Sequence, residues 1–262
     1  MLTERSARVV ASVKLHRQVA RRRAQRFLVE GAHLVGAASD RGLVREIFVT
    51  EAAAQRYATL LGGHDAAAVS LVTERAAKAL SDTVTPVGLV AVCEQPRLDL
   101  DDVLAGSPGL VAVAVEIGEP GNAGTLIRIA DAMGAAAVVF GGHSVDPYNG
   151  KCLRASAGSI FSIPVVVAPD VGAAVTALQA NGLRVLATTV DGELSLDDAE
   201  LAGPTAWLFG AEAHGLSPQL ARQADNRVTI PMCGGAQSLN VAAAAAICLY
   251  QSARAQRAGP NR

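Results

Sequence analysis

The chain has 262 residues, half of them hydrophobic but only 3% aromatic, and its formal net charge at pH 7 is −1. This length exceeds one typical domain, so we expect two. A chain rich in Ala and Val and poor in aromatic residues favours helices packed over strands, which is an α/β fold, and disfavours an aromatic-filled β-sandwich.

The sequence also argues against a membrane protein and against a metal site. Its longest apolar stretch, Val241 to Tyr250, is much shorter than the roughly 20 residues of a membrane-spanning helix. The charged N-terminus differs from a signal peptide. The four cysteines and five histidines lack the spacing of zinc ligands or of a disulfide framework. We therefore expect a cytoplasmic protein with reduced, mostly buried thiols, no metal and no membrane segment.

Basic residues are concentrated at the N-terminal end. Residues 1–30 contain eight Lys and Arg residues but only two Glu residues. This uneven charge predicts a polyanionic partner at this end, because guanidinium groups bind phosphates. The alternatives are a solvated helix face and a flexible tail. The candidate phosphate contacts are Arg21, Arg22, Arg23 and Arg26.

The first 93 residues predict a small α/β domain. Helical segments, one of them at 51–61, alternate there with strand-like segments at 26–31, 43–50, 68–72 and 88–93. Residues 94–108 carry Pro, Gly and clustered acids without a long periodic pattern, which is typical of a linker with room for one helical turn. We place the first domain at residues 1–93, the linker at 94–108 and the second domain at 109–262.

The second domain is predicted to contain a parallel sheet. Its strand-like segments are of the buried type and lie at 110–116, 136–140, 164–167, 183–188, 205–209 and 227–230. Helical segments separate most of these strands. Such an alternation predicts a parallel sheet covered by helices on both faces.

Three polar, glycine-bearing segments each follow one of these strands. They are GEPGNAGTLIR at 118–128, LFGAEAHGLS at 208–217 and IPMCGGAQSLN at 230–240. Ligands of open α/β sheets bind beyond the carboxyl ends of the strands, so we expect the three segments to meet at one site. Asn122 is predicted to cap a helix over 123–133 that stops at Gly134.

Each polar side chain in these segments also has a purely structural explanation. Arg128 is three residues from Asp131 and could pair with it on the helix surface. Glu212 could cap the helix that follows it or face water. Ser238 and Asn240 are ordinary helix-capping residues.

Several familiar signatures are missing from the chain. The glycines at 118, 121 and 124 form GxxGxxG instead of GxGxxG, and the Gly150-Lys151 pair lacks the rest of a P-loop. No GxSxG segment is present. These observations disfavour a dehydrogenase, a nucleoside triphosphatase and a serine hydrolase.

Taken together, the motifs resemble those of one enzyme family. NAGTLIR at 122–128, LFGAEAHGLS at 208–217 and IPMCGGAQSLNVAAAAA at 230–246 are similar, in this order, to the motifs of the SpoU, or TrmH-like, RNA 2′-O-ribose methyltransferases. VDPYNGK at 145–151 with RASAG at 154–158 is similar to a further family segment. The resemblance spans essentially residues 109–255.

The N-terminal domain carries a second resemblance. FLVEG at 27–31 and GLVAV at 88–92 resemble parts of the L30e-like substrate-binding domain that often precedes this catalytic domain. Among family members, the chain resembles ribosomal RNA methyltransferases of the thiostrepton-resistance and mitochondrial large-subunit type. The resemblance implies an RNA substrate and adds Arg154 to the candidate RNA contacts.

The family resemblance implies a deep trefoil knot near the C-terminus, although chains generally avoid threading their own loops. It also implies that the knotted loops bind S-adenosylmethionine. Carried onto this chain, the implied cofactor contacts are Thr188, Leu208, Gly210, Ile230, Met232 and Leu239.

The resemblance assigns roles to the polar residues of the motifs. Arg128 would stabilise the developing oxyanion of the ribose or clamp the neighbouring phosphate, and Asn122 would orient the site. A guanidinium stays protonated in proteins, so Arg128 is not expected to act as a base. Glu212 would orient Arg128 or its own loop, while Ser238 and Asn240 would shape the knot and contact the ribose.

The resemblance further implies a homodimer in which the helix from Val241 to Tyr250 forms part of the interface. A monomer with a buried terminal helix is the alternative. The expected function is S-adenosylmethionine-dependent methylation of a ribose 2′-hydroxyl in ribosomal RNA.

Three other functions remain as alternatives. The first is the same reaction on transfer RNA. The second is a non-enzymatic RNA-binding scaffold, which would have no need to keep Asn122, Arg128, Glu212 and Asn240 together. The third is a metabolic enzyme that uses another nucleotide, and it would have no affinity for RNA.

Overall fold

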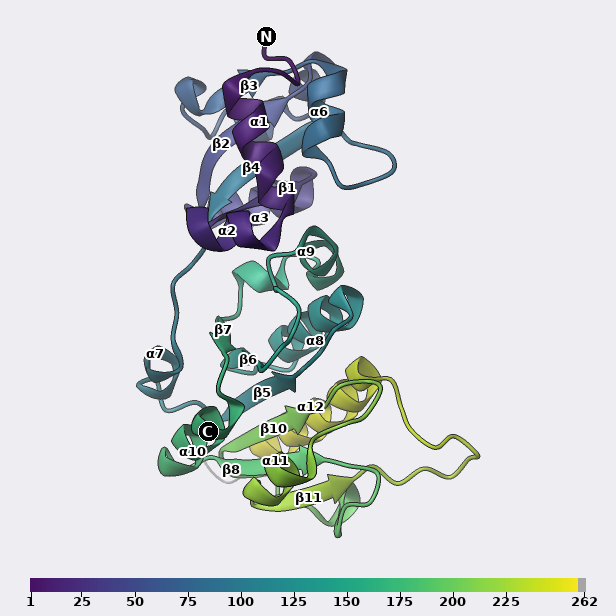
Figure 1. Ribbon diagram of the computed structural model, residues 1–262. Coiled ribbons are helices and arrows are strands. Elements are labelled where there is room, and N and C mark those ends of the chain that lie inside the picture. The colour runs from purple at the N-terminus through teal and green to yellow at the C-terminus, as the bar shows by residue number, and fades with distance from the viewer. Residues whose placement is uncertain (259–262) are drawn as a thin grey trace. The chain divides into compact units, whose positions relative to one another are not determined.

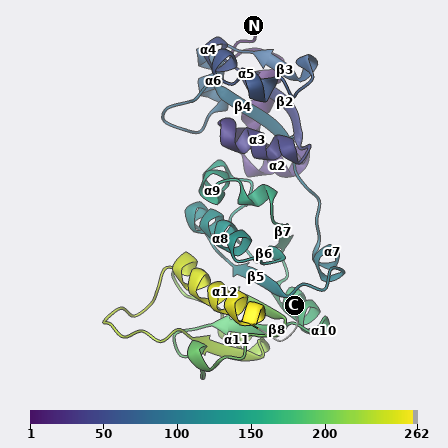
Figure 2. The ribbon, with the colours of Figure 1, turned by 180° about the vertical axis from the view of Figure 1, so that it is seen from behind.

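The computed structural model describes residues 1–258 and divides the chain into two compact units. Unit 1 comprises Met1–Arg97 and Tyr148–Phe161, and unit 2 comprises Leu98–Pro147 and Ser162–Arg262. Figures 1 and 2 show the ribbon from opposite sides. No helix among residues 1–258 is long and apolar enough to cross a membrane.

Unit 1 is built on a four-stranded mixed sheet with the strand order β1-β4-β2-β3. β4 pairs antiparallel with β1 and with β2, whereas β3 is parallel to β2. The strands are β1 (Arg26–Glu30), β2 (Val44–Val49), β3 (Val69–Leu71) and β4 (Leu89–Glu94). The helices are α1 (Ala7–Val13), α2 (Gln18–Ala24), α3 (Ala32–Asp40), α4 (Glu51–Arg56), α5 (Ala58–Leu61), α6 (Glu74–Leu80) and α9 (Gly150–Ser156), with 3₁₀ turns η1 (Lys14–His16), η2 (Ala66–Ala68) and η3 (Ser159–Phe161).

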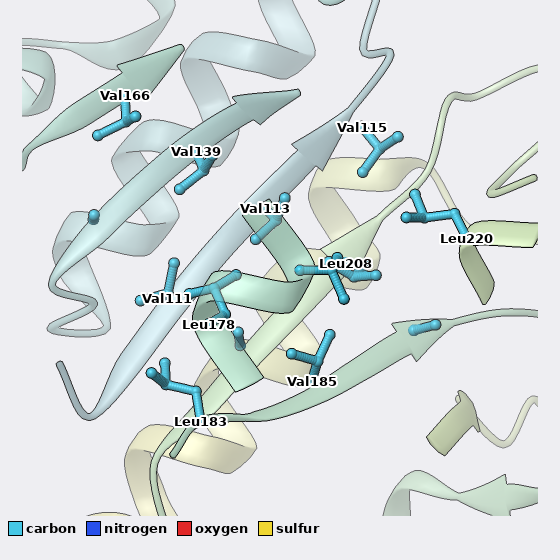
Figure 3. Packing of buried hydrophobic residues seen from close by; sticks show 14 of the residues in the cluster. Val111, Val113, Val115, Val139, Val166, Leu178, Leu183, Val185, Leu208 and Leu220 are labelled. Atoms are coloured by element: carbon cyan, nitrogen blue, oxygen red, sulfur yellow. The ribbon is translucent and has the colours of Figure 1, made fainter. Parts of the chain in front are cut away.

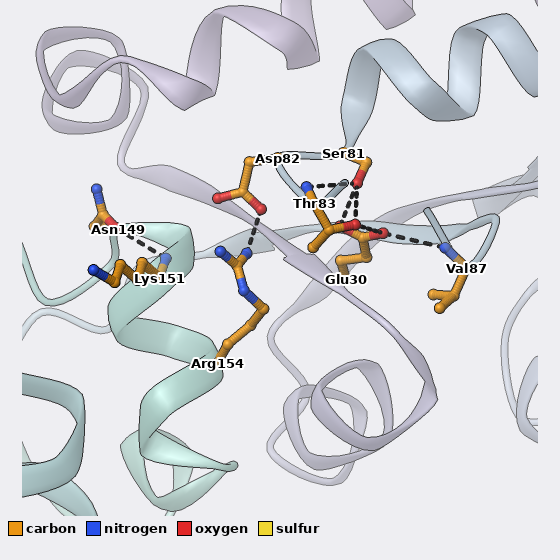
Figure 4. Close-up of polar contacts among 8 residues, drawn as sticks. All are labelled: Glu30, Ser81, Asp82, Thr83, Val87, Asn149, Lys151 and Arg154. Atoms are coloured by element: carbon orange, nitrogen blue, oxygen red, sulfur yellow. Dashed lines mark hydrogen bonds and ion pairs between the residues drawn. The ribbon is translucent and has the colours of Figure 1, made fainter. Parts of the chain in front are cut away.

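The segment from Tyr148 to Phe161 packs into unit 1 although it lies far along the chain. The Phe27 ring of β1 contacts the Tyr148 ring, with centroids 4.7 Å apart, and stacks on the Phe161 ring at 6.3 Å. Asp82 forms an ion pair with Arg154 of α9, as Figure 4 shows. Aromatic contacts and a charge pair therefore hold this segment on β1 and on the loop that follows α6.

Part of that same loop is fixed by one carboxylate. Glu30 accepts hydrogen bonds from the hydroxyls of Ser81 and Thr83, at 2.6 and 3.1 Å, and from the Val87 backbone N–H at 3.3 Å (Figure 4). Three donors from one loop on one carboxylate restrict the loop more than a single exposed hydrogen bond would. This arrangement presents Asp82 to α9.

Unit 2 contains a seven-stranded sheet in the order β7-β6-β5-β10-β8-β11-β9, and every pairing in it is parallel. The strands are β5 (Leu110–Val115), β6 (Ala137–Gly141), β7 (Val165–Ala168), β8 (Arg184–Thr188), β9 (Leu194–Ser195), β10 (Thr205–Phe209) and β11 (Asn226–Thr229). The helices are α7 (Leu100–Leu104), α8 (Pro120–Ala132), α10 (Val171–Ala180), α11 (Pro218–Gln223) and α12 (Val241–Ala258), with the 3₁₀ turn η4 (Leu196–Asp198). The predicted parallel sheet is therefore confirmed.

Helices cover both faces of this sheet. Val111, Val113, Val185 and Leu208 pack with side chains of α7, α10 and α11 in one buried cluster, part of which Figure 3 shows. On the other face, α8 and α12 pack against each other and against β5. There the buried Trp207 indole donates a 2.8 Å hydrogen bond to Ser252 of α12. Because helices bury the sheet on both faces, both sides of each strand are apolar, and the strand segments are nearly continuous runs of Val and Ala.

Outside the site, the structure departs from the predicted elements in the following places. The basic N-terminal stretch forms α1, η1 and α2, whereas the sequence predicted a helix there only as one alternative and without bounds. The predicted helix over 51–61 breaks at Tyr57 into α4 and α5. The two-residue β9 was not predicted, because so short a strand has no periodic signal. The trefoil knot stays a prediction.

The thiols are as expected mostly buried. Cys93, Cys152 and Cys248 are buried, and burial raises the pKa of Cys93 and of Cys248 to about 12. Cys233 is exposed. Within residues 1–258, no cluster of His, Cys, Asp and Glu is suited to hold a metal ion.

Candidate functional site

Four adjacent strands of unit 2 end at one edge of the sheet, and the polar segments follow them there. β5, β10, β8 and β11 are neighbours in the sheet and run parallel. Their carboxyl ends therefore lead into residues 116–120, 210–217, 189–193 and 230–240 on the same side. This is the edge where ligands of open parallel sheets bind.

The helix after β5 begins earlier than predicted. α8 starts at Pro120, and its N-cap is Glu119, whose carboxylate accepts from the Gly121 N–H at 3.3 Å. The prediction that Asn122 is the N-cap is therefore wrong. Pro at the first helical position is preorganised for a helix start, which explains the shift. Gly134, with φ +75°, does end the helix as predicted.

Because Asn122 is not a cap, its side chain is available to bridge two other segments. Its amide nitrogen donates to Glu212 Oε1 at 2.6 Å, and its amide oxygen accepts from Asn240 Nδ2 at 3.1 Å. Asn240 in turn caps α12, since its oxygen accepts from the Ala242 N–H at 2.9 Å. The structure thus joins three of the five predicted catalytic residues in one hydrogen-bonded chain.

Glu212 does not cap a helix, which was its alternative role. The cap of α11 is the Ser217 hydroxyl, which accepts from the Leu220 N–H at 3.3 Å. Glu212 lies on a tight loop that closes on itself, where the Gly215 N–H donates to the Ala211 carbonyl at 2.8 Å. A Cβ added at Gly210 would overlap the backbone of residues 215 and 216, so only glycine fits there.

A pocket of about 770 Å³ lies between the segments that follow β8, β10 and β11. Glu212 and Ser238 line it. Of the six predicted cofactor contacts, five also line it: Thr188, Gly210, Ile230, Met232 and Leu239. Leu208 is fully buried, and its carbonyl accepts from the Thr188 hydroxyl at 2.8 Å.

Arg128 lies on α8, apart from the lining of this pocket. Its side chain is exposed, and no residue in 1–258 forms a hydrogen bond or ion pair with it. The alternative pairing with Asp131 is not seen. A free guanidinium on the helix that carries Asn122 is able to meet an anionic ligand.

Sequence reasoning missed several residues at this edge. Thr189, Val190 and Asp191 line the pocket immediately after β8, and their only sequence signal is that they follow a strand. The Thr189 hydroxyl is buried and has no hydrogen-bond partner among residues 1–258. A buried unpaired hydroxyl in a pocket wall is suited to a polar atom of a ligand.

Two further residues at this edge were missed, Glu116 and His214. Glu116 follows β5 directly and has a left-handed backbone, with φ +54°. His214 lies two residues after Glu212 and lines the pocket, and its Nε2 is 3.4 Å from Glu116 Oε2.

The predicted RNA contacts lie in unit 1 in three different settings. Arg22, Arg23 and Arg26 are exposed. Arg21 is buried, and its Nη1 donates to the carbonyls of residues 15 and 16, both at 2.9 Å. Arg154 is partly exposed and paired with Asp82. The buried Arg21 is held inside the unit, whereas the other four reach the surface.

The fold and the site define an α/β protein with a ligand pocket at the carboxyl edge of a parallel sheet, preceded by a smaller mixed-sheet unit. Residues 109–250 match the model of the SpoU rRNA methylase family, and residues 7–91 match that of the MRM3-like substrate binding domain. The chain belongs to the SpoU rRNA methylase family.

Relatives and solved structures agree with this assignment. The chain is 35% identical over 240 residues to the 23S rRNA (guanosine(2553)-2′-O)-methyltransferase RlmP of Bacillus subtilis, covering 90% of this chain and 92% of that protein. It is similar to the AdoMet complex of the SpoU methyltransferase AviRb from Streptomyces viridochromogenes, with a TM-score of 0.85, 32% identity, and 97% and 100% of the two chains covered. The AdoMet-bound rRNA methyltransferase of Sinorhizobium meliloti gives a TM-score of 0.85 at 28% identity, with 95% of each chain covered.

We predict that Gly210→Ala destabilises unit 2. The new Cβ overlaps the backbone of residues 215 and 216, so the loop must move, and overpacking of this kind costs about 1–3 kcal/mol. Urea unfolding measures the loss in the free energy of unfolding. Gly203→Ala is the matched control, because nothing lies within 4 Å of its Cβ position. Equal stability of the two variants would contradict the close approach at Gly210.

Proposed function

We propose that this chain transfers a methyl group from S-adenosylmethionine to a ribose 2′-hydroxyl in ribosomal RNA. The observation that carries the proposal is the hydrogen-bonded chain Glu212–Asn122–Asn240, which joins all three family motifs beside the pocket. The names of the relatives support the same reaction and substrate. This function requires the compartment that holds ribosomal RNA, which in bacteria is the cytoplasm.

The pocket residues fit S-adenosylmethionine. The volume of about 770 Å³ falls within the range of small-molecule sites. Met232 and Leu239 are each 38% exposed at its wall and offer apolar surface to a ring, while the unpaired Thr189 hydroxyl offers a polar contact. We assign cofactor binding to the lining residues Thr188, Thr189, Gly210, Ile230, Met232 and Leu239, with Leu208 supporting Thr188 through its carbonyl. When bound, S-adenosylmethionine supplies an electrophilic methyl group on a sulfonium sulfur.

The chain's own residues position the ribose and stabilise its oxygen. Transfer by in-line displacement requires the 2′-oxygen to be aligned with the methyl carbon. Arg128, exposed and unpaired in residues 1–258, stabilises the negative charge that develops on that oxygen or clamps the adjacent phosphate. Asn122 orients the ribose. Glu212 and Asn240 fix the Asn122 amide from both sides, and Ser238 shapes the pocket wall.

Replacing Arg128 tests this function. We expect Arg128→Ala to lower kcat by about 10²–10³-fold, the effect of removing one charge-stabilising donor. Arg128→Lys should recover part of the rate, because it keeps the charge without the planar fork. Transfer of radiolabelled methyl groups to ribosomal RNA measures kcat, and calorimetry measures donor affinity, which should not change.

The control is Arg257→Ala, at the exposed end of α12, which should leave kcat unchanged. Wild-type protein that binds the donor but labels no ribose would reject the proposed function. Full activity in Arg128→Ala would reject only the role of Arg128.

We further propose that the N-terminal domain, residues 1–93, binds the RNA, that residues 94–108 are a linker, and that residues 109–262 carry the reaction. Exposed Arg22, Arg23 and Arg26 are the proposed phosphate contacts, and Arg154 joins them if RNA displaces Asp82. Arg21 donates to two backbone carbonyls inside the unit, so its proposed role is to hold α2 in place and not to bind phosphate.

The proposed RNA surface predicts a change in salt dependence. Replacing Arg22, Arg23 and Arg26 together by Ala removes up to three cationic partners of phosphates. The logarithm of the binding constant should then fall less steeply with the logarithm of the salt concentration, by roughly 0.7 in slope for each phosphate no longer neutralised. Filter binding to ribosomal RNA at several salt concentrations measures the slope.

The charge-matched control for this experiment replaces three other exposed arginines of unit 1, Arg41, Arg56 and Arg75, by Ala. It removes the same charge from the unit at positions outside the proposed RNA surface, so its slope should stay close to that of wild type. An equal decrease in both variants would show a general charge effect without a specific surface.

We also propose a homodimer through α12. Its outer face exposes Ala243, Ile247, Tyr250 and Arg254, spaced by three or four residues, with Ile247 and Tyr250 37% and 50% exposed. The apolar part of this stripe, Ala243, Ile247 and Tyr250, is suited to pack on a second copy of the same helix.

The dimer predicts sedimentation as a two-chain species at micromolar concentration. Ile247→Asp should shift it to the monomer, because a carboxylate would be buried in the interface. Val84→Asp is the control, since Val84 is fully exposed in unit 1. A wild-type monomer at micromolar concentration would contradict the proposal.

A further inference from the structure

The proposed mechanism leaves one requirement without an assigned residue. Methylation of a neutral 2′-hydroxyl releases one proton, which needs an acceptor. Arg128 cannot accept it, because a guanidinium stays protonated in proteins. Glu212 Oε1 already accepts a hydrogen bond from the Asn122 amide at 2.6 Å, so that oxygen is occupied.

Two residues at the same edge of the sheet are unused, and they face each other. Glu116 follows β5 with φ +54°, a backbone conformation that side-chain-bearing residues seldom adopt. Its N–H donates to the Gly141 carbonyl at 3.1 Å, and its Cγ packs where a Cβ on Gly142 would come within 3.0 Å. Strained residues of this kind are concentrated at functional sites.

The Glu116 carboxylate faces the imidazole of His214. The separation between Glu116 Oε2 and His214 Nε2 is 3.4 Å, and unbound sites often show such long contacts that tighten when substrate binds. His214 lines the pocket, its side chain is 65% exposed, and its Nδ1 has no hydrogen bond within residues 1–258. A carboxylate that accepts from Nε2–H fixes the tautomer in which Nδ1 carries the lone pair.

We propose that His214 is the catalytic proton acceptor of the reaction and that Glu116 is the residue that positions it. The inference rests on the proposed function. Imidazole is the side chain best suited to accept a proton at neutral pH, and a base oriented by a carboxylate recurs in many enzymes. His214 and Glu212 lie on the same loop, and Glu212 binds the Asn122 amide. One loop therefore positions both the proposed base and the amide proposed to orient the ribose.

The step balances without a further reagent. The O–H bond of the ribose 2′-hydroxyl breaks, and its proton moves to His214 Nδ1. The oxygen's electron pair forms the bond to the methyl carbon as the carbon–sulfur bond breaks, and that bond's electron pair stays on sulfur. The Glu116 carboxylate stabilises the resulting imidazolium, which then releases its proton to water.

The following charged groups surround His214, the proposed proton acceptor. Glu116 faces the ring from the end of β5, Glu212 lies two residues away on the same loop, and His143 is next to Gly142. The other charged residues that line the pocket are Asp191, Arg222 and Arg227, of which Asp191 and Arg227 pair with each other at 3.4 Å. Of these groups, Glu116 is the one whose carboxylate is in contact with the His214 ring.

The test measures kcat against pH with the full chain and ribosomal RNA. For wild type, the logarithm of kcat should fall by one for each pH unit at low pH, because the imidazolium has no lone pair to accept a proton. This decrease at low pH is the acid limb of the profile. His214→Gln should lower kcat at neutral pH by about 10²-fold or more and should lose this acid limb. Glu116→Gln should give a smaller loss and keep the limb. KM for RNA and donor affinity by calorimetry should stay as in wild type.

His143→Gln is the matched control, an exposed histidine beside the pair that should keep the wild-type profile. A second measurement does not depend on activity. Long-range ¹H–¹⁵N NMR of the five imidazole rings should show His214 as the Nε2–H tautomer, and Glu116→Gln should reduce that preference.

An acid limb that survives in His214→Gln, with kcat near wild type, would overturn the inference, as would an Nδ1–H tautomer at His214. These results would leave the proposed function intact as long as wild type methylates the RNA in the parallel assay. Absence of wild-type transfer despite donor binding would instead reject the proposed function, and the inference with it.

Discussion

The parallel pairing of β5, β10, β8 and β11 brings four strand ends to one edge of the sheet, and the site depends on that pairing. Asn122 and Asn240 are 118 residues apart in the chain, yet their amides are 3.1 Å apart. Closing such a loop costs conformational entropy that one exposed hydrogen bond, worth about 1 kcal/mol, does not offset. The buried Val and Leu side chains between the sheet and its helices therefore hold the site together.

The loop over residues 210–217 connects the two halves of that site. Gly210 lines the pocket, while Glu212 of the same loop binds Asn122 on α8. The loop closes through the Gly215 N–H, which donates to the Ala211 carbonyl, and it has no space for a Cβ at Gly210. Through Glu212 the pocket wall is thus in direct contact with the Asn122 amide, the group proposed to orient the ribose.

The sheet could be predicted because its strands are buried on both faces and read as Val and Ala runs, and the position of the site followed from the strand ends. The side-chain partners could not. Nothing in the sequence near Asn122 indicates that Glu212 contacts it, and the start of α8 depends on whether Pro120 or Asn122 begins the helix. Arg21 shares its basic run with Arg22 and Arg23, and only the packing of α2 shows that Arg21 is buried.

The segment from Tyr148 to Phe161 has a consequence for how the chain can be divided. It belongs in sequence to the family motif region, but its aromatic rings pack on Phe27 of β1 and its Arg154 pairs with Asp82. The chain therefore passes between the two units three times, after Arg97, after Pro147 and after Phe161. A cut in the linker would leave Tyr148 and Phe161 without their apolar partner, so the N-terminal unit is a structural part of the enzyme as well as its proposed RNA-binding part.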